Sequence, residues 1–324
     1  MHMDLKVGLS CNNKCRHCVM EPVRRRLLAE DQPADTEFSV LKALIEDGLG
    51  RGMKSITLTG GEPTLRADFW RLLRAAVAAG LAVTVQTNGR LLAGRKAEAE
   101  LTALSRRDIV FVVALHGPEA EIHDRITRAP GSFAETVEGL HNLVNLGFPV
   151  CGKLVLSNYN LAVMPATLGF MRRLGLKEVL VAFPHAEDFS LTELRDVLPS
   201  YAEVKKVLIE INSGLWSLEL LKWESIPFCV FPTPEFFSQS IDLDYLRQRL
   251  KNEATSIEMT MTGQRLDWTE SRQTVKGKSH QCRSCLLDLV CEGVWEEYLD
   301  LYGDRDFVPV SNQEVVASFL EKLP

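Results

Sequence analysis

Three closely spaced cysteines near the start of the 324-residue chain are its most reactive feature. Cys11, Cys15 and Cys18 lie in the run CNNKCRHC, so their thiolates can reach one metal centre. An iron–sulfur cube has four iron corners and usually takes four thiolates. Three thiolates would leave one iron free to bind another ligand. The alternative is a zinc site in which His17 supplies a fourth ligand next to Cys18.

A second segment that could do chemistry is LTGGEPTLRADFW, at residues 58–70. Its Gly60 and Gly61 lack a Cβ and would let a ligand pack against a strand-to-helix turn; the alternative is a plain turn. Together the two segments resemble the radical S-adenosylmethionine (AdoMet) superfamily. The signature of that family is a three-cysteine motif of this spacing after the first strand and a Gly-Gly-Glu-Pro loop after the second. A zinc site would leave this second loop unexplained.

The resemblance implies both cofactors and chemistry. Cys11, Cys15 and Cys18 would hold a [4Fe-4S] cluster whose open iron binds AdoMet. One electron would cleave AdoMet to a 5′-deoxyadenosyl radical that abstracts hydrogen, while the protein orients and shields the cofactor. The residues predicted to bind S-adenosyl-L-methionine lie at strand ends or on the fifth strand: Gly60, Gly61, Glu62, Pro63, Thr87, Asn88 and Lys153.

Some of these assignments have plainer alternatives. Thr87 and Asn88 could form a simple turn. Lys153 could bind the AdoMet carboxylate or a substrate if it faces the inside of a barrel, and would be unremarkable if it faces outward. At the end of the fourth strand, Ala114 stands where many relatives carry a serine, so one hydroxyl contact of the family is missing.

A second cysteine set lies near the C-terminus. Cys282, Cys285 and Cys291 form CRSCLLDLVC, and Cys229 lies upstream after Ile-Pro-Phe. This pattern resembles the twitch domain, a shortened SPASM domain, in which four such thiolates bind an auxiliary [4Fe-4S] cluster with no free iron. Structural zinc bound by four sulfurs is the alternative. The remaining Cys151 is interpreted as a buried core thiol rather than a hydrogen donor, because it begins its strand.

Strand and helix patterns alternate over the first two-thirds of the chain, which favours a parallel sheet. The six strands are predicted at residues 5–9, 55–59, 82–87, 109–115, 150–156 and 178–183. The family resemblance makes this an α/β fold, a six-stranded parallel (β/α)6 partial TIM barrel with a small C-terminal α+β cluster-binding domain. We place the barrel at residues 4–210 and the twitch-like domain at 211–324, leaving out Met1–Met3 as a cloning remnant.

Beyond the sixth strand the pattern changes. We expect helices over residues 191–211 with a break at Pro199, and an antiparallel strand pair at 255–261 and 266–269. His185, Glu187 and Asp188 follow the sixth strand and could line a substrate opening, or be ordinary loop residues.

Composition narrows the class of protein. Hydrophobic residues make up 46% and charged residues 25%, as in ordinary globular proteins. The net charge of −6 gives no basic footprint for nucleic acid. No apolar stretch approaches the about 20 residues that span a bilayer. We see no export signal, which predicts a cytoplasmic, reducing compartment and cysteines that bind metal. Arg24–Arg26 are interpreted as a solvated face, or else as a receptor for an anionic substrate.

The predicted activity is that of a radical AdoMet enzyme in a biosynthetic pathway. Its substrate would be a small molecule: a natural product, a sugar or nucleotide, or a cofactor precursor. The alternative is a maturase of a ribosomally made peptide. A third possibility is an iron–sulfur electron-transfer protein, which would not need the Gly-Gly-Glu-Pro loop. An enzyme of this class would also need an electron donor such as flavodoxin or ferredoxin.

Overall fold

The computed structural model describes residues 2–187, 189–211, 220–233, 256–259, 265–267 and 274–321. At its centre is a nine-stranded sheet of order β7-β6-β5-β4-β3-β2-β1-β8-β9. All neighbours from β7 to β8 are parallel, and β9 is antiparallel to β8. The strands are β1 His2–Gly8, β2 Ser55–Gly60, β3 Ala82–Thr87, β4 Ile109–Ala114, β5 Val150–Val155, β6 Glu178–Ala182, β7 Leu220–Glu224, β8 Ser256–Met259 and β9 Arg265–Asp267.

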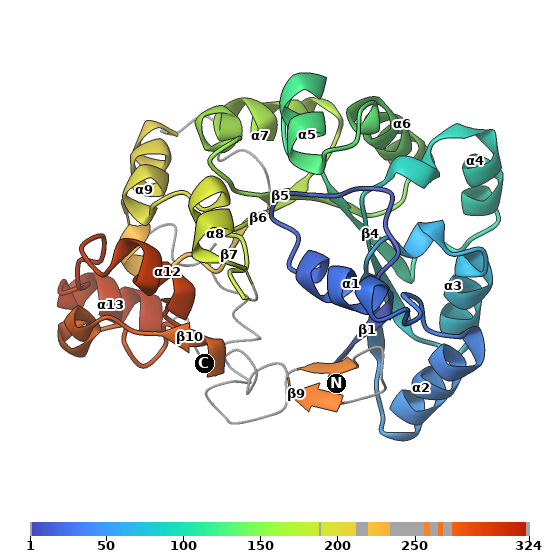
Figure 1. Cartoon of the computed structure of the whole chain (residues 1–324), viewed down its shortest axis with the longest axis horizontal. Coiled ribbons are helices and arrows are strands. Elements are labelled where there is room, and N and C mark those ends of the chain that lie inside the picture. Colours follow the sequence, from blue (N-terminus) through green and yellow to red (C-terminus); the bar gives the residue numbers. More distant parts are fainter. Residues whose placement is uncertain are drawn as a thin grey trace.

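Helices surround this curved sheet. Figure 1 shows α2 to α7 in an arc outside the strands, with α1 near the centre of the view. The helices are α1 Met20–Ala29, α2 Phe38–Gly50, α3 Phe69–Ala78, α4 Gly94–Thr102, α5 Ala120–Thr127, α6 Ser132–Asn145, α7 Met164–Arg173, α8 Leu191–Val197, α9 Tyr201–Glu210, α12 Glu296–Tyr302 and α13 Gln313–Leu320. The α/β partial-barrel class is therefore confirmed.

The apolar pattern explains which face of each element is covered. On β1, Met3, Leu5 and Val7 are buried, while the residues between them are partly exposed, as the two-residue period of a strand requires. On α3, the buried residues Phe69, Leu72, Leu73 and Ala76 follow the spacing of one helix face. The core lies between these two faces, and the carboxyl ends of the strands carry the loops predicted to bind ligands.

The strand count corrects the sequence prediction. A seventh parallel strand, β7, pairs with β6 through Glu178 and Leu220, and β8 pairs with β1 on the other side. The predicted antiparallel pair is present as β8 and β9. The first strand also begins earlier than expected: His2 lies within hydrogen-bond distance of Ser55 Oγ (2.8 Å) and Thr57 Oγ1 (2.9 Å). Excluding residues 2 and 3 from the fold was therefore wrong.

The C-terminal part packs against the barrel through aromatic side chains. Helices α8 and α9 are separated at Pro199 as predicted, and each begins with a capping box. The Tyr201 ring lies 4.4 Å from both Phe183 and Tyr298, measured between ring centroids. Strands β10 (Lys276–Gly277) and β11 (Val294–Trp295) form a small separate sheet. Across the described ranges, none of the helices combines the length and the apolar character needed to cross a bilayer.

Candidate functional site

The loop that carries the first cysteine set leaves β1 and is fixed by the end of α5. The backbone amides of Lys14 and Arg16 donate to the carbonyl oxygens of Thr127 (2.9 Å) and Ile126 (3.0 Å). Arg128 returns a hydrogen bond from its Nε to the Lys14 carbonyl oxygen at 2.7 Å. These contacts hold the cysteine loop across the carboxyl end of the sheet, where ligands bind in parallel α/β folds.

The glycine turn after β2 packs directly on the cysteine loop. The amides of Gly61 and Glu62 donate to the carbonyl oxygens of Gly8 (2.7 Å) and Ser10 (2.8 Å). A Cβ on Gly61 would lie 2.3 Å from the Ser10 oxygen, and Gly60 has a φ of 121°. The prediction that these glycines leave room for a ligand therefore needs correction, because the loop backbone fills the space that a side chain would need.

Glu62 ties this turn to the end of β3. Its side chain is 3% exposed. One carboxylate oxygen accepts from Thr87 Oγ1 at 2.7 Å and from the Thr64 amide at 2.9 Å, and the other accepts from the Asn88 amide at 2.7 Å. Burial raises the pKa of Glu62, while these hydrogen bonds act in the opposite direction. The buried Pro63 follows and begins a short 3-10 helix.

The turn after β3 reaches back to the first cysteines. Asn88 Nδ2 donates to Asn12 Oδ1 at 2.7 Å and lies 4.0 Å from the Cys11 sulfur. Arg90, which no sequence motif indicates, donates to Asn13 Oδ1 at 2.8 Å. The Asn13 amide lies 3.4 Å from the same sulfur. Thr87 and Asn88 thus form more than a simple turn, since they connect β3 to both predicted ligand loops.

The three cysteines of the first set are partly buried. Burial raises the pKa of Cys11, Cys15 and Cys18, and the Arg24 guanidinium acts in the opposite direction on each. Arg24 forms an ion pair with Glu21, and its side chain is only 12% exposed. The interpretation of Arg24–Arg26 as a solvated face is therefore wrong for Arg24, whose charge lies beside the cysteines.

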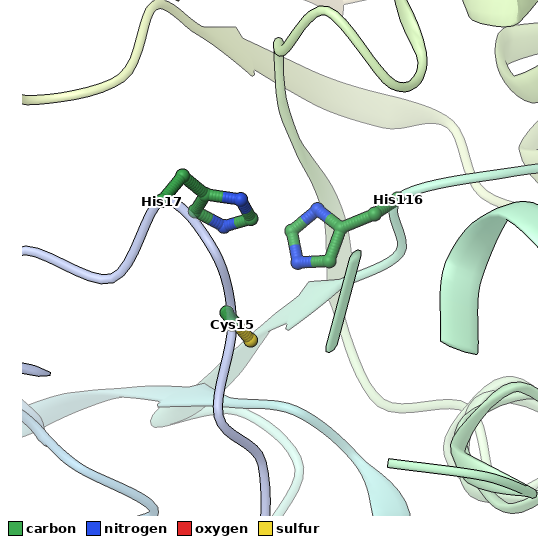
Figure 2. Close-up of side chains that lie close together, drawn as sticks. All are labelled: Cys15, His17 and His116. Atoms are coloured by element: carbon green, nitrogen blue, oxygen red, sulfur yellow. The ribbon is translucent and has the colours of Figure 1, made fainter. Parts of the chain in front are cut away.

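Two histidines lie next to Cys15. Ligand atoms of Cys15, His17 and His116 all lie within 4.8 Å of one another (Figure 2). The rings of His17 and His116 meet edge to face at 4.6 Å, and the His116 amide donates to His123 Nδ1 at 3.1 Å. Burial lowers the pKa of His17 and His123 to about 4, and that of His116 well below its ordinary value.

Lys153 faces away from the covering helices. Its strand neighbours Gly152 and Leu154 are buried, whereas Lys153 is partly exposed and pairs with Glu224 on β7 (Nζ to Oε2, 3.2 Å). Ala114 lies opposite Lys153 in the β4–β5 register. The Lys153 charge contributes to lowering the pKa of His17 and His116, so it acts on the region above the cysteine loop.

The second cysteine set converges on one cavity. Cys229, Cys282, Cys285 and Cys291 line a space of about 420 Å³, which includes open solvent. The same cavity has apolar lining from Phe228, Leu287, Val294 and Phe307. Burial raises the pKa of Cys229 to about 12 and also raises that of Cys291. The distant Cys229 and the C-terminal triplet thus line the same cavity, and their binding of a cluster stays a prediction.

The remaining candidates lie elsewhere. His185 Nδ1 is 3.3 Å from Glu187 Oε2, and its ring packs on Trp295 at 4.4 Å. Asp188 lies outside the described residues. Cys151 is half-buried at the start of β5, at the opposite end of the strand from the ligand loops, and burial raises its pKa to about 11. The expectation of a fully buried thiol is therefore only partly met.

The family model for the radical SAM superfamily matches residues 5–170, which is just over half of the chain and includes both ligand loops. The chain belongs to the radical SAM superfamily. It is 26% identical over 256 residues to the AdoMet-dependent heme synthase of Nitratidesulfovibrio vulgaris, covering 78% of this chain and 63% of that protein. It is 33% identical over 139 residues to the mycofactocin maturase MftC of Mycolicibacterium smegmatis, covering 43% of this chain and 33% of that protein.

Solved structures agree on the fold. The structure of Streptococcus suis SuiB bound to S-adenosylmethionine superposes with a TM-score of 0.64 at 14% identity, covering 96% of this chain and 76% of SuiB. At this identity the likeness concerns the fold alone. The chain spans between 34% and 66% of the length of the first three curated relatives that it matches.

Proposed function

We propose that this chain is a radical AdoMet enzyme that abstracts hydrogen from a small molecule in a biosynthetic pathway. The observation that carries the proposal is the packing of the cysteine loop on the Gly60-Gly61 turn within a radical SAM fold. When bound, a [4Fe-4S] cluster at Cys11, Cys15 and Cys18 supplies the electron that cleaves AdoMet to a 5′-deoxyadenosyl radical. An electron donor such as flavodoxin or ferredoxin would reduce it, in a cytoplasmic setting.

The spacing of the first thiols fits a cluster better than one zinc ion. Two sulfurs on one zinc lie at most about 4.6 Å apart, since each Zn–S bond is near 2.3 Å. Within the described part of the chain, the group of three ligand atoms inside 4.8 Å joins Cys15 to two histidines and leaves out Cys11 and Cys18. The sulfurs of Cys11, Cys15 and Cys18 therefore do not all lie within 4.8 Å of one another, which suits the separate corners of a multi-iron cluster.

The chain's own residues would bind and orient AdoMet. In the proposal, backbone groups of Gly60, Gly61 and Pro63 face the AdoMet ammonium. Glu62 holds that turn against Thr87 and Asn88 through its hydrogen bonds. Lys153 offers a positive charge to the AdoMet carboxylate, and Glu224 orients its amine. Ala114 offers no hydroxyl to AdoMet. Lys153 lies opposite Ala114 in the β4–β5 register, so the Lys153 charge would take a larger share in binding AdoMet.

The second set would hold an auxiliary [4Fe-4S] cluster. Four thiols line the cavity, so each iron of a cube can take one of them and none is left for substrate. Such a cluster passes electrons rather than binding ligands. The apolar lining from Phe228 and Phe307 supports this role, because it would keep water away from the cluster. The proposed twitch-like domain does not begin cleanly at residue 211, because β7, β8 and β9 belong to the same sheet as the barrel strands.

Two substrate classes have specific support. A small molecule is favoured because the match to the heme synthase covers 78% of the chain and so reaches beyond the barrel motifs. Peptide maturation is the second candidate, supported by the match to MftC, which covers 43% of the chain. His185 and Glu187 would face either substrate from the end of β6. An electron carrier without radical chemistry would need no site for the AdoMet ammonium, which is the role proposed for the backbone of the Gly60-Gly61 turn.

The test is AdoMet cleavage by the anaerobically reconstituted protein. With dithionite as reductant, the wild-type chain should form 5′-deoxyadenosine, and the Cys11→Ala, Cys15→Ala, Cys18→Ala triple variant should form none. Cys151→Ala is the matched control and should retain cleavage. Formation of 5′-deoxyadenosine by the triple variant would contradict the proposal, as would its absence from wild-type protein with full iron content.

A further inference from the structure

The closest gathering of metal-binding side chains in the described residues is not the cysteine triplet itself. It consists of Cys15, His17 and His116, whose ligand atoms lie within 4.8 Å of one another. Figure 2 shows the two imidazole rings side by side, with the sulfur of Cys15 below them. Cys15 and His17 come from the loop after β1, whereas His116 comes from the segment that follows β4, about a hundred residues later.

The imidazoles have nitrogen atoms available for a ligand. The Nδ1 atoms of His17 and His116 are buried and make no hydrogen bond within the described chain. His116 is only 2% exposed. A buried polar nitrogen without a partner is costly, and native proteins rarely leave one without a reason. A metal ion bound between the rings would remove that cost.

The fold also holds this group in place. The His116 amide donates to His123 Nδ1 at 3.1 Å, and the His116 carbonyl accepts from Asn160 Nδ2 at 3.0 Å. On the other side, the Arg16 amide donates to the Ile126 carbonyl at 3.0 Å, next to His17. The backbone at His116 and the backbone next to His17 are thus held by contacts to α5 and to a neighbouring loop. The three side chains would therefore need little rearrangement to bind an ion.

We propose that Cys15, His17 and His116 bind one divalent transition-metal ion, such as Zn²⁺, in the cluster-free protein. Thiolate and imidazole are both zinc ligands, and a site with three protein ligands leaves the fourth position to water. In this site His17 and His116 take the positions that Cys11 and Cys18 would take in a three-cysteine zinc site. The ion and a cluster at Cys11, Cys15 and Cys18 exclude each other, because both need Cys15. Zinc bound here therefore blocks assembly of the first cluster.

The experiment uses full-length protein prepared without iron. Zinc stoichiometry is measured after dialysis, and Co²⁺ serves as the optical probe of a thiolate-containing site. The second cysteine set can also bind zinc. The readout is therefore the difference between the number of zinc ions bound by each variant and the number bound by the wild type. We expect His116→Gln and Cys15→Ser each to bind one ion fewer. Cys11→Ser, Cys18→Ser and the exposed-histidine control His141→Gln should bind as many ions as wild type.

A second measurement follows iron uptake. Wild-type protein preloaded with one equivalent of zinc should assemble the first cluster more slowly than zinc-free protein, and His116→Gln should remove most of that delay. If Cys11→Ser or Cys18→Ser loses the ion while His116→Gln keeps it, the ion is bound by a three-cysteine site and the proposal is wrong. Circular dichroism of each variant identifies misfolding, and His116→Asn then replaces a misfolded His116→Gln. These results do not depend on whether the loaded enzyme cleaves AdoMet.

Discussion

The two cysteine sets differ in what surrounds them. The first set lies on one short loop that polar contacts fix from three directions: the end of α5, the Gly60-Gly61 turn and the end of β3. The second set assembles from two distant segments around a cavity with apolar lining. A polar surround orients a ligand through directed hydrogen bonds, whereas an apolar surround excludes water. Under the proposed function, the first surround would orient a reactant and the second would shield an auxiliary cluster.

The supports of the two sites are also separate. Glu62 connects the first site to β2 and β3 through hydrogen bonds to Thr87 and Asn88. The second region is held by the Tyr201–Tyr298–Asp306 contacts beside α9 and α12. A change in one support should therefore affect one site and leave the other loaded. The variants of Gly61, Glu62 and Tyr298 described below test this separation.

The largest effect is expected for Gly61→Ala. Its new Cβ would lie 2.3 Å from the Ser10 oxygen, so the cysteine loop must move. We expect a loss of about 3 kcal/mol or more in the free energy of unfolding and loss of first-site iron. Urea denaturation and iron analysis are the measurements. Gly50→Ala is the control, because a Cβ there meets nothing within 4 Å. Full iron content in Gly61→Ala would contradict the packing argument.

Glu62→Gln should have a smaller effect on the same site. The amide nitrogen cannot accept the hydrogen bonds that one carboxylate oxygen now accepts, so a buried donor from Thr87 or Asn88 loses its partner. The expected cost is about 1–3 kcal/mol in the free energy of unfolding, with weaker AdoMet binding. Equilibrium dialysis with labelled AdoMet measures the affinity. Glu98→Gln, at an exposed position, is the control, and equal affinities in the two variants would refute the role of Glu62.

Tyr298→Phe tests the second region. Its hydroxyl accepts from the Tyr201 amide at 2.8 Å and donates to Asp306 at 2.7 Å. Removing it should cost about 1–2 kcal/mol in the free energy of unfolding, while AdoMet affinity at the first site stays unchanged. Chemical denaturation and AdoMet dialysis on the same samples give both values. A fall in AdoMet affinity as large as that of Glu62→Gln would show that the two supports are not separate.

A pH-dependent effect is expected for Lys6 on β1. Burial lowers its pKa from 10.5 to about 8. Between these values the unfolded chain keeps a proton that the folded chain has released, so the free energy of unfolding should rise with pH across this window. Lys6→Met should flatten that rise, and the exposed Lys42→Met should leave it unchanged. Urea midpoints at pH 7.5, 9 and 10.5 would measure it, and identical profiles in the wild type and Lys6→Met would disprove it.

The sequence predicted the features that depend on local pattern. Alternating apolar residues marked the first six strands, and cysteine spacing selected the thiols that line each site. Strand β7 was missed because Leu220–Glu224 is short and carries Lys222 and Glu224 within its five residues. Helix α1 was also missed, since it has no buried residues and so no apolar stripe to recognise.

The features that were not predicted depend on contacts between distant segments. His116 meets Cys15 because β4 and the loop after β1 end at the same edge of the sheet, which no local pattern reveals. Arg90 contacts Asn13 for the same reason. The role of Gly61 was misread because its motif indicates a turn but does not say which backbone lies against it.

The most direct test of the central claim is an iron count on matched samples. Reconstituted wild-type protein should hold about eight irons, because each of two [4Fe-4S] clusters contains four. The triple alanine variant of Cys11, Cys15 and Cys18 should hold about four irons, and so should Cys282→Ala, Cys285→Ala, Cys291→Ala. Two variants that each keep about half of the iron would establish two independent clusters. A wild-type count near four, or zinc in place of iron at the second set, would contradict the account.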